Sequence, residues 1–298
     1  MMEKNKLYTV GIAGLVLQIH SEKELIINES FTAFLLYDTE PDVQAVFQEV
    51  EELPVIQENV VYEDYFYKVH QDKDGYLYSF FNAPRDLSVY AIAASDKKMT
   101  HICIDYLENG SHCVSELRNC FSHLNFESIL IRRKRLFFHA ACVDTHLGGL
   151  LFTGRSGAGK STQAELWNKY RSAVHVNGDR PILSKGKVGW KAWGSPYAGS
   201  SKYHVNRNCS VTAIIMLRQS SSCCLRKLRM KEAFRAVWEG ITVHSWDKVF
   251  VEEASGLVME LISGVPVYEF YCTPDEYAVD YLEKCLRKEW GLCQHIIN

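Results

Sequence analysis

The pattern of apolar and polar positions changes character near residue 130. Before that point, short apolar runs with β-type alternation follow one another. After it, strand-like runs alternate with segments of helical periodicity, as in proteins with mixed α/β layers. We therefore predict a smaller β-rich N-terminal module over residues 1–110 and an α/β (α+β) domain over residues 111–298.

Individual elements follow from the same pattern. In the first part, the predicted strands are 7–19, 31–37, 63–69, 76–81 and 87–92. In the second part, the predicted strands are 136–143, 149–153, 173–176, 190–193, 211–217 and 265–271. The predicted helices are 111–135, 160–170, 230–239, 253–263 and a terminal helix that ends near residue 288. Thr273, which precedes Pro274, is the expected N-cap of the terminal helix.

A basic run, ArgArgLysArg at 132–135, ends the helix predicted over 111–135. Such a run invites a nucleic-acid interface, but it has few charges and no interleaved aromatic residues. We favour a solvated helix C-terminus, where cations complement the helix dipole. His244 and Asp247 are likewise expected on the surface without a function.

Composition narrows the classes of partner. The 298 residues are 47% apolar and 23% charged, with a net charge of -3, so no overall positive field favours nucleic acid. No apolar run reaches the about 18 residues that span a bilayer. The ten cysteines show no metal-type spacing and no CxxC, and no secretory signal is recognisable at the start. We expect reduced thiols, a cytoplasmic location and no membrane partner.

The most informative segment is GlyArgSerGlyAlaGlyLysSerThr at 154–162, which matches the Walker A pattern GxxxxGK[ST]. It lies between a predicted strand and a predicted helix, the context that phosphate binding requires. The predicted nucleotide-binding residues are Gly154, Arg155, Ser156, Gly157, Ala158, Gly159, Lys160, Ser161 and Thr162.

Each residue type in this loop has a physical role. The glycines permit positive φ angles and a close approach of the backbone to phosphate oxygens. The successive amide groups then form an anion-binding nest at a helix N-terminus. Lys160 supplies a cation for the β and γ phosphates, and the Ser161 hydroxyl is placed to ligate Mg²⁺. The segment predicts a site for a nucleoside triphosphate with magnesium.

Other residues would complete such a site. Asp179 follows a short predicted strand, so its carboxylate would emerge at a strand end and ligate Mg²⁺; the alternative is a turn residue beside Gly178. His139 precedes the loop strand and is either functional or a satisfied core histidine. In the polar segment 194–207, whose glycines and serines predict a flexible loop, Lys202 and Arg207 would reach a transferred phosphoryl group or be solvated cations.

The blocks PhePheHisAlaAlaCysVal (137–143), the Walker A loop, AsnGlyAspArgProIleLeu (177–183) and TrpGlySerProTyrAlaGly (193–199) together resemble the HPr kinase/phosphorylase-related kinases. That group shares its fold with the ATP-dependent phosphoenolpyruvate carboxykinases. The resemblance implies ATP as the nucleotide, catalytic roles for His139, Asp179 and Arg207, and metal ligation by Ser161 and Asp179.

One position departs from the family pattern. Gly178 stands where HPr kinases have the aspartate held to be the general base, and loss of a base typically costs about 10²–10⁴-fold in rate. The stretch that contacts HPr is not recognisable, so HPr itself is not an expected substrate.

Two classes of function therefore stay open. The first is an ATP- and Mg²⁺-dependent kinase acting on a hydroxyl of an unidentified peptide, protein or small molecule. The second is a catalytically weak nucleotide-binding regulatory or peptide-binding protein. Self-association is left open. A motor-type ATPase is disfavoured, because no Walker B string of four apolar residues before an acid follows the loop.

Overall fold

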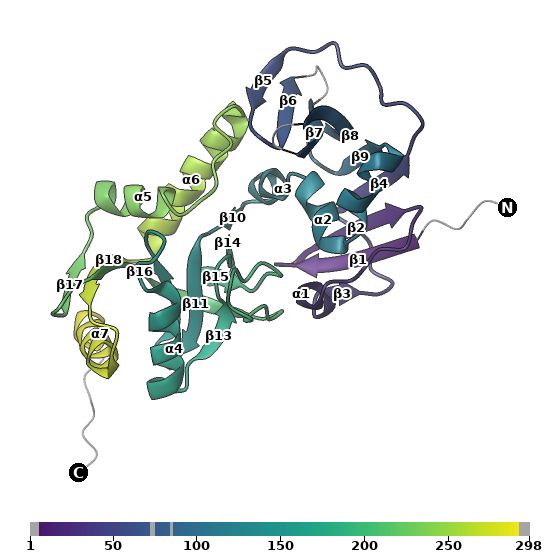
Figure 1. Ribbon diagram of the computed structural model, residues 1–298. Helices are drawn as coiled ribbons and strands as arrows, with labels where there is room; N and C mark the ends of the chain where they lie inside the picture. Colours follow the sequence, from purple (N-terminus) through teal and green to yellow (C-terminus); the bar gives the residue numbers. More distant parts are fainter. Residues whose placement is uncertain (1–5, 72–74, 84–85, 292–298) are drawn as a thin grey trace. The chain divides into compact units, whose positions relative to one another are not determined.

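The computed structural model describes residues 6–71, 75–83 and 86–291. Residues 1–5, where no secretory signal was recognised, and Cys293 fall outside these ranges. Contacts divide the chain into two compact units: Met1–Arg133 with His244–Val251, and Lys134–Val243 with Glu252–Asn298. Each unit contains one large mixed sheet, and the fold is mixed α/β (Figure 1).

The first unit is rich in strands. Its strands are β1 (Lys6–Ile12), β2 (Leu15–Ser21), β3 (Leu35–Leu36), β4 (Val43–Glu49), β5 (Val60–Glu63), β6 (Tyr67–Gln71), β7 (Gly75–Ala83), β8 (Asp86–Asp96) and β9 (His101–Tyr106). In the described residues they form a nine-stranded sheet in the order β3-β1-β2-β4-β9-β8-β7-β6-β5. Strand β4 pairs in parallel with β2 and β9, and the remaining neighbours are antiparallel.

Short helical segments complete this unit: α1 (Glu29–Thr32), the 3₁₀ helix η1 (Glu108–Val114), α2 (Leu117–His123) and α3 (Phe126–Arg132). The continuous helix predicted over 111–135 was wrong. Asn125 adopts a left-handed conformation, with φ 51°, which an asparagine tolerates and which separates α2 from α3. Phe121 of α2 packs against Phe126 at 5.5 Å between ring centroids. The first unit thus includes residues 111–133, which the sequence analysis assigned to the second domain.

Turns account for the other differences in the first unit. The strand predicted over 7–19 is a hairpin, in which Ala13 and Gly14 both take positive φ. The strand predicted over 63–69 is interrupted where the Asp64 carboxylate accepts bonds from the next backbone amides. The prediction over 31–37 was wrong, since α1 occupies its start and only β3 is extended. Apolar alternation continues through these turns and therefore conceals them.

The segment His244–Val251 returns from the second half of the chain to the first unit. Asp247 is 1% exposed there and pairs with Arg132 at 2.8 Å. The buried His244 forms a hydrogen bond with the Ser128 hydroxyl at 3.0 Å, and burial lowers the pKa of His244 to about 4. The surface location expected for His244 and Asp247 was therefore wrong. The basic run is not a solvated helix end either, because Arg133 donates to the carbonyls of Asp42, Met99 and two further residues.

The buried ion pair makes a prediction about stability. Removing one partner leaves an uncompensated buried charge, so Asp247→Ala should lower the free energy of unfolding by about 3–5 kcal/mol. Glu63→Ala, which removes an exposed partner of Lys68 in the same unit, should cost under about 1 kcal/mol. Urea denaturation of the full chain compares the two variants. Equal effects would contradict a structural role for the Arg132–Asp247 pair.

The second unit contains the predicted nucleotide-binding loop. Its strands are β10 (Arg135–Phe137), β11 (Ala140–Thr145), β12 (Gly148–Thr153), β13 (Val174–Asn177), β14 (Ile182–Lys185), β15 (Trp190–Trp193), β16 (Asn208–Gln219), β17 (Cys224–Lys227) and β18 (Val267–Cys272). Among the residues described, they form a sheet in the order β10-β14-β15-β16-β12-β11-β13, with β18 paired to both β16 and β17. The long β16 lies parallel to β12 and to β18.

Four longer helices belong to this half of the chain: α4 (Lys160–Arg171), α5 (Met230–Trp238), α6 (Lys248–Gly264) and α7 (Glu276–Glu289). Helices α4 and α7 share one buried apolar cluster with β11, β12, β16 and β18, including Phe152, Trp167 and Leu282. The bounds of α4, α5 and α7 agree closely with the predicted helices, whereas α6 begins at Lys248, before the predicted start at Glu253. The N-cap of α7 is Asp275 rather than Thr273, because the Asp275 carboxylate accepts from the backbone of Ala278. No helix of the described part is both long and apolar enough to cross a bilayer.

Candidate functional site

Three strand ends meet at one edge of the second sheet. Strand β11 is antiparallel to both β12 and β13, so it starts where they end. Ala140, the first residue of β11, lies opposite Thr153 at the end of β12. Its amide also donates to the carbonyl of Asp179 at 3.0 Å, and the Thr153 hydroxyl donates to the carbonyl of His139 at 3.0 Å. His139, Asp179 and the start of the loop after Thr153 are thereby brought together.

The loop after β12 has the backbone that its glycines were expected to allow. Gly154, Gly157 and Gly159 have φ angles of 140°, 78° and 97°. Open space surrounds the Cβ position of Gly157 and of Gly159, so conformation rather than crowding requires glycine at these two positions. Gly159 is the N-cap of α4, whose first turn begins at Lys160. The predicted arrangement of a strand, a loop and a helix is confirmed, and it is the arrangement that an anion-binding loop requires.

Side chains close this loop on itself. The Lys160 ammonium donates to the carbonyls of Gly154 and Arg155 at 3.2 and 3.4 Å, and the Gln219 amide donates to Gly157 at 2.7 Å. Burial lowers the pKa of Lys160, while Asp179 acts in the opposite direction. A phosphate oxygen would offer Lys160 a charged acceptor in place of two neutral carbonyls, which makes a stronger hydrogen bond.

Asp179 and His139 form a hydrogen-bonded pair, with 3.1 Å between Oδ1 and Nε2. This bond lowers the pKa of Asp179, and the charges of Arg180 and Lys160 lower it further, against the opposing effect of burial. Asp179 is therefore an anionic carboxylate at neutral pH. Its oxygens and the exposed Ser161 hydroxyl are hard donors suited to Mg²⁺, which takes one or two protein oxygens and completes its shell with phosphates and water. No cluster of three His, Cys, Asp or Glu side chains for a protein-only metal cage occurs among the described residues.

The buried Asn177 turns the chain at this point. Its side-chain oxygen accepts from the amides of Asp179 and Arg180 at 2.9 and 2.6 Å, and its amide donates to the carbonyl of Ser195 at 3.0 Å. One side chain thus directs the end of β13 and fixes the start of the 194–207 segment. Asparagine favours such local turns, but the bond to Ser195 could not be inferred from sequence.

Arg180 brings a second cation to the site, and the sequence analysis missed it. Its Nε lies 3.7 Å from the Asp179 carboxylate, and its guanidinium lies over the Phe137 ring at 5.7 Å. The Arg180 charge also lowers the pKa of Lys160, so the two cations lie within electrostatic range of each other. The only signal in the sequence was its position directly after Asp179.

Arg207, predicted as catalytic, is placed elsewhere. It pairs with Asp144 at 3.1 Å, and Asp144 lies opposite Gly149 at the start of β12, whereas the loop follows the end of that strand. Thr153 lies four residue steps along the strand from Gly149, which corresponds to about 13 Å. The catalytic role expected for Arg207 is therefore not supported. Arg207 instead forms an ion pair near the end of β12 that lies opposite to the loop. Lys202 is exposed on its loop.

The polar segment 194–207, which was expected to be a flexible loop, makes several contacts with β13 and the residues after it. Besides the Asn177 bond, the amide of Gly178 donates to the carbonyl of Tyr203 at 3.2 Å. The Tyr203 ring stacks on His175 with 3.6 Å between centroids and an interplanar angle of 3°. A Cβ built on Gly178 would lie 1.6 Å from the Ser201 hydroxyl. Close packing of this segment therefore requires glycine at position 178.

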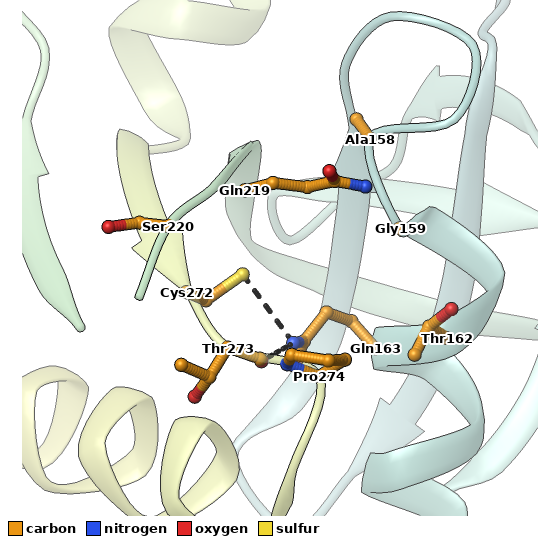
Figure 2. A pocket seen from close by; sticks show the side chains of 9 residues that line it. All are labelled: Ala158, Gly159, Thr162, Gln163, Gln219, Ser220, Cys272, Thr273 and Pro274. Atoms are coloured by element: carbon orange, nitrogen blue, oxygen red, sulfur yellow. Dashed lines mark hydrogen bonds between the residues drawn. The ribbon is translucent and has the colours of Figure 1, made fainter. Parts of the chain in front are cut away.

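A pocket of about 460 Å³ lies beside the loop (Figure 2). The buried Gln163 donates through its amide to the Thr273 carbonyl at 3.1 Å and to the Cys272 sulfur at 3.5 Å, while its buried side-chain oxygen has no partner among the described residues. The pocket lining includes five residues at the ends of β16 and β18 that belong to no sequence motif. The sequence analysis missed them because only the parallel pairing of these two strands brings them together. The lining residues are Ala158, Gly159, Thr162, Gln163, Gln219, Ser220, Cys272, Thr273 and Pro274.

No family model and no curated protein matches the chain. Among solved structures, the chain is similar to the Hpr(Ser) kinase/phosphatase from Coxiella burnetii, at 14% identity and a TM-score of 0.33, over 52% of this chain and 98% of the other. A similarity this weak supports neither a shared fold nor a shared activity. The resemblance to HPr-kinase-related proteins thus stays a prediction, and the site is interpreted from its own geometry.

The Asp179–His139 pair predicts a measurable titration. We expect the pKa of Asp179 to lie below its usual value of about 3.9 and to rise toward that value in His139→Gln. Because the folded pKa is depressed, Asp179 stabilises the fold above the unfolded pKa, and this contribution is lost as pH falls through the folded value. Carboxyl ¹³C NMR of the metal-free protein measures the shift.

A matched control is His146→Gln, which removes another histidine–carboxylate contact, to Glu283 at 2.9 Å. It should leave the Asp179 titration unchanged. An Asp179 pKa that is the same in wild type and His139→Gln would contradict the pairing.

Proposed function

We propose that the second unit is a phosphotransferase that binds a nucleoside triphosphate with Mg²⁺ and transfers the γ-phosphoryl group to a hydroxyl. One observation carries this proposal: Lys160 and Arg180 flank the Asp179–His139 pair at the sheet edge where the glycine-rich loop begins. A phosphate-binding loop alone would support binding. Two cations and a carboxylate beside it supply what phosphoryl transfer needs.

Each group has a task in the proposed reaction. The loop amides and Lys160 hold the phosphates, and Arg180 stabilises the negative charge on the transferred group. Asp179 and Ser161 hold Mg²⁺, which when bound neutralises phosphate charge. His139, hydrogen-bonded to Asp179 and 33% exposed, orients the acceptor hydroxyl and can accept its proton.

The pocket in Figure 2 is suited to the nucleoside. It shares Ala158, Gly159 and Thr162 with the loop, so a ligand with its phosphates on the loop would extend into it. Its lining includes the polar residues Thr162, Gln163 and Gln219. Adenine is the base implied by the family resemblance. The acceptor is an unidentified peptide, protein or small molecule.

A regulatory nucleotide-binding protein is the second candidate. Gly178 favours it, because no second carboxylate adjoins Asp179 and the Ser201 side chain occupies the space of one. In that case the triphosphate would bind, but its γ-phosphoryl group would not be transferred to an added acceptor. Separate measurement of binding and of transfer distinguishes the two functions.

The loop lysine provides the first functional prediction. Lys160→Ala should weaken binding of a fluorescent triphosphate nucleotide at least about tenfold, because it removes a charge-assisted contact worth about 1.5–3 kcal/mol. Lys169→Ala is the control, since Lys169 lies on the same helix in its last turn. Fluorescence titration measures both variants. Equal affinity of Lys160→Ala and wild type would refute the predicted site.

Arg180 and Arg207 provide the second functional prediction. Arg180→Gln should reduce the transfer of label from γ-labelled ATP by about 10²–10³-fold, the typical cost of losing one group that stabilises transition-state charge. Arg207→Gln should leave transfer unchanged, because Arg207 pairs with Asp144 near the end of β12 that lies opposite to the loop. Transfer is measured to acceptors drawn from the products of neighbouring genes. The reverse ranking of the two variants would contradict the assignment of Arg180.

A further inference from the structure

Ser201 occupies the space beside Gly178 that a side chain at position 178 would fill. A Cβ on Gly178 would lie 1.6 Å from the Ser201 Oγ and 2.5 Å from its Cβ, so the serine side chain packs directly on the glycine backbone. Ser201 is partly exposed. Its hydroxyl therefore lies against Gly178, the residue before Asp179, in a side chain that is partly open to solvent.

The surrounding loop keeps Ser201 in this place. Tyr203 is held by its stacking on His175 and by the bond that its carbonyl accepts from Gly178. On the other side of Ser201, a Cβ on Gly199 would lie 2.9 Å from the Asp179 Cγ. The tip of the loop thus packs on the same carboxylate that pairs with His139. A serine hydroxyl therefore belongs to the loop whose tip packs on Asp179 and lies against the residue that precedes Asp179.

We propose that Ser201 is a phosphate acceptor of this protein itself and that the chain phosphorylates this residue. The inference rests on the proposed function. In the reaction the Ser201 Oγ attacks the γ-phosphorus, an O–P bond forms, and the bond between the γ-phosphorus and the β–γ bridging oxygen breaks. The nucleoside diphosphate leaves, and the hydroxyl proton passes to water at the exposed side of Ser201.

The chemistry of the hydroxyl permits this attack. Ser201 donates its proton to the carbonyl of Ala198 at 2.7 Å, and its oxygen accepts from the Tyr203 amide at 3.4 Å. A hydroxyl oxygen has two lone pairs, so one is left for the phosphorus. Phosphoryl transfer through a loose transition state depends chiefly on positioning and charge stabilisation. An acceptor held in the same chain gains effective concentrations of about 10⁵ M or more when well aligned. Positioning by the loop can therefore offset the absence of a second acid at position 178.

The product has a structural consequence. A phosphate on Ser201 adds about 1.5 to 2 negative charges close to the Asp179 carboxylate. It also enlarges a side chain that already touches Gly178. Phosphorylated Ser201 therefore leaves its place, and the loop tip separates from β13.

The test uses the full chain with γ-labelled ATP and Mg²⁺, followed by peptide mass mapping. Label is expected on Ser201, absent in Ser201→Ala, and retained in Ser200→Ala, which removes an exposed neighbouring hydroxyl. The initial rate per molecule should not depend on protein concentration, because the acceptor belongs to the same chain. Labelled protein should also exchange its amide hydrogens faster over 198–203.

A second variant changes the contact without removing the hydroxyl. Gly178→Ala forces Ser201 away, and a misplacement of about 1 Å should slow labelling about a hundredfold, expressed per bound nucleotide.

The outcomes separate this inference from the proposed function. Wild type that binds the triphosphate without phosphate on Ser201, whether it labels another residue, an added acceptor or nothing, overturns the inference and leaves the nucleotide site standing. Wild type that does not bind the triphosphate overturns both. Equal loss of Ser201 label in Ser200→Ala and Ser201→Ala would also count against a specific acceptor.

Discussion

The buried side chain of Asn177 determines the geometry of the site. Its oxygen accepts two backbone amides, which turns the chain so that Asp179 and Arg180 stand at the sheet edge. Its amide group holds Ser195 and hence the start of the neighbouring loop. Asn177 is fully buried, and hydrogen bonds are stronger in a low-dielectric interior, so each bond fixes position as well as adding stability. The pairing of Asp179 with His139 and the approach of Ser201 to Gly178 both depend on this turn.

The parts of the site that could be predicted from sequence are those with a local cause. Gly154, Gly157 and Gly159 are required by their own backbone angles, so the string of residue types was sufficient to predict the loop. Helix α4 and the strand before the loop could also be predicted, because their local residue patterns were sufficient. His139 and Asp179 were also identified, His139 within the strand predicted over 136–143 and Asp179 shortly after the strand predicted over 173–176. Their hydrogen bond depends on the antiparallel pairing of β11 with β13, which no local pattern specifies.

The parts that could not be predicted depend on contacts distant in sequence. Arg207 and Arg180 are equivalent as residue types, and only the sheet order brings Arg180 to the loop and Arg207 to Asp144. Gly178 was interpreted as a missing acid, whereas the structure shows a glycine that Ser201 contacts. The pocket beside the loop is lined by loop residues and by the ends of β16 and β18, and the residues from these two strand ends form no motif.

In the first unit, too, contacts between residues distant in sequence prevented a correct prediction of the domain boundary. Its sheet was predicted in outline from alternating apolar runs, but the return of His244–Val251 was not, because that segment lies more than a hundred residues after the helices it packs against. Asp247 looked like a surface residue in a polar stretch. Its burial follows from Arg132, which needs a carboxylate inside the unit.

The phosphate-binding character of the loop is tested most directly by competition against a bound fluorescent triphosphate nucleotide. Inorganic tripolyphosphate with Mg²⁺ and the free nucleoside are titrated separately. The geometry of Gly154 to Thr162 predicts that tripolyphosphate displaces the probe and that the nucleoside does so far less effectively. Displacement by the nucleoside with no effect of tripolyphosphate would contradict a phosphate-binding loop.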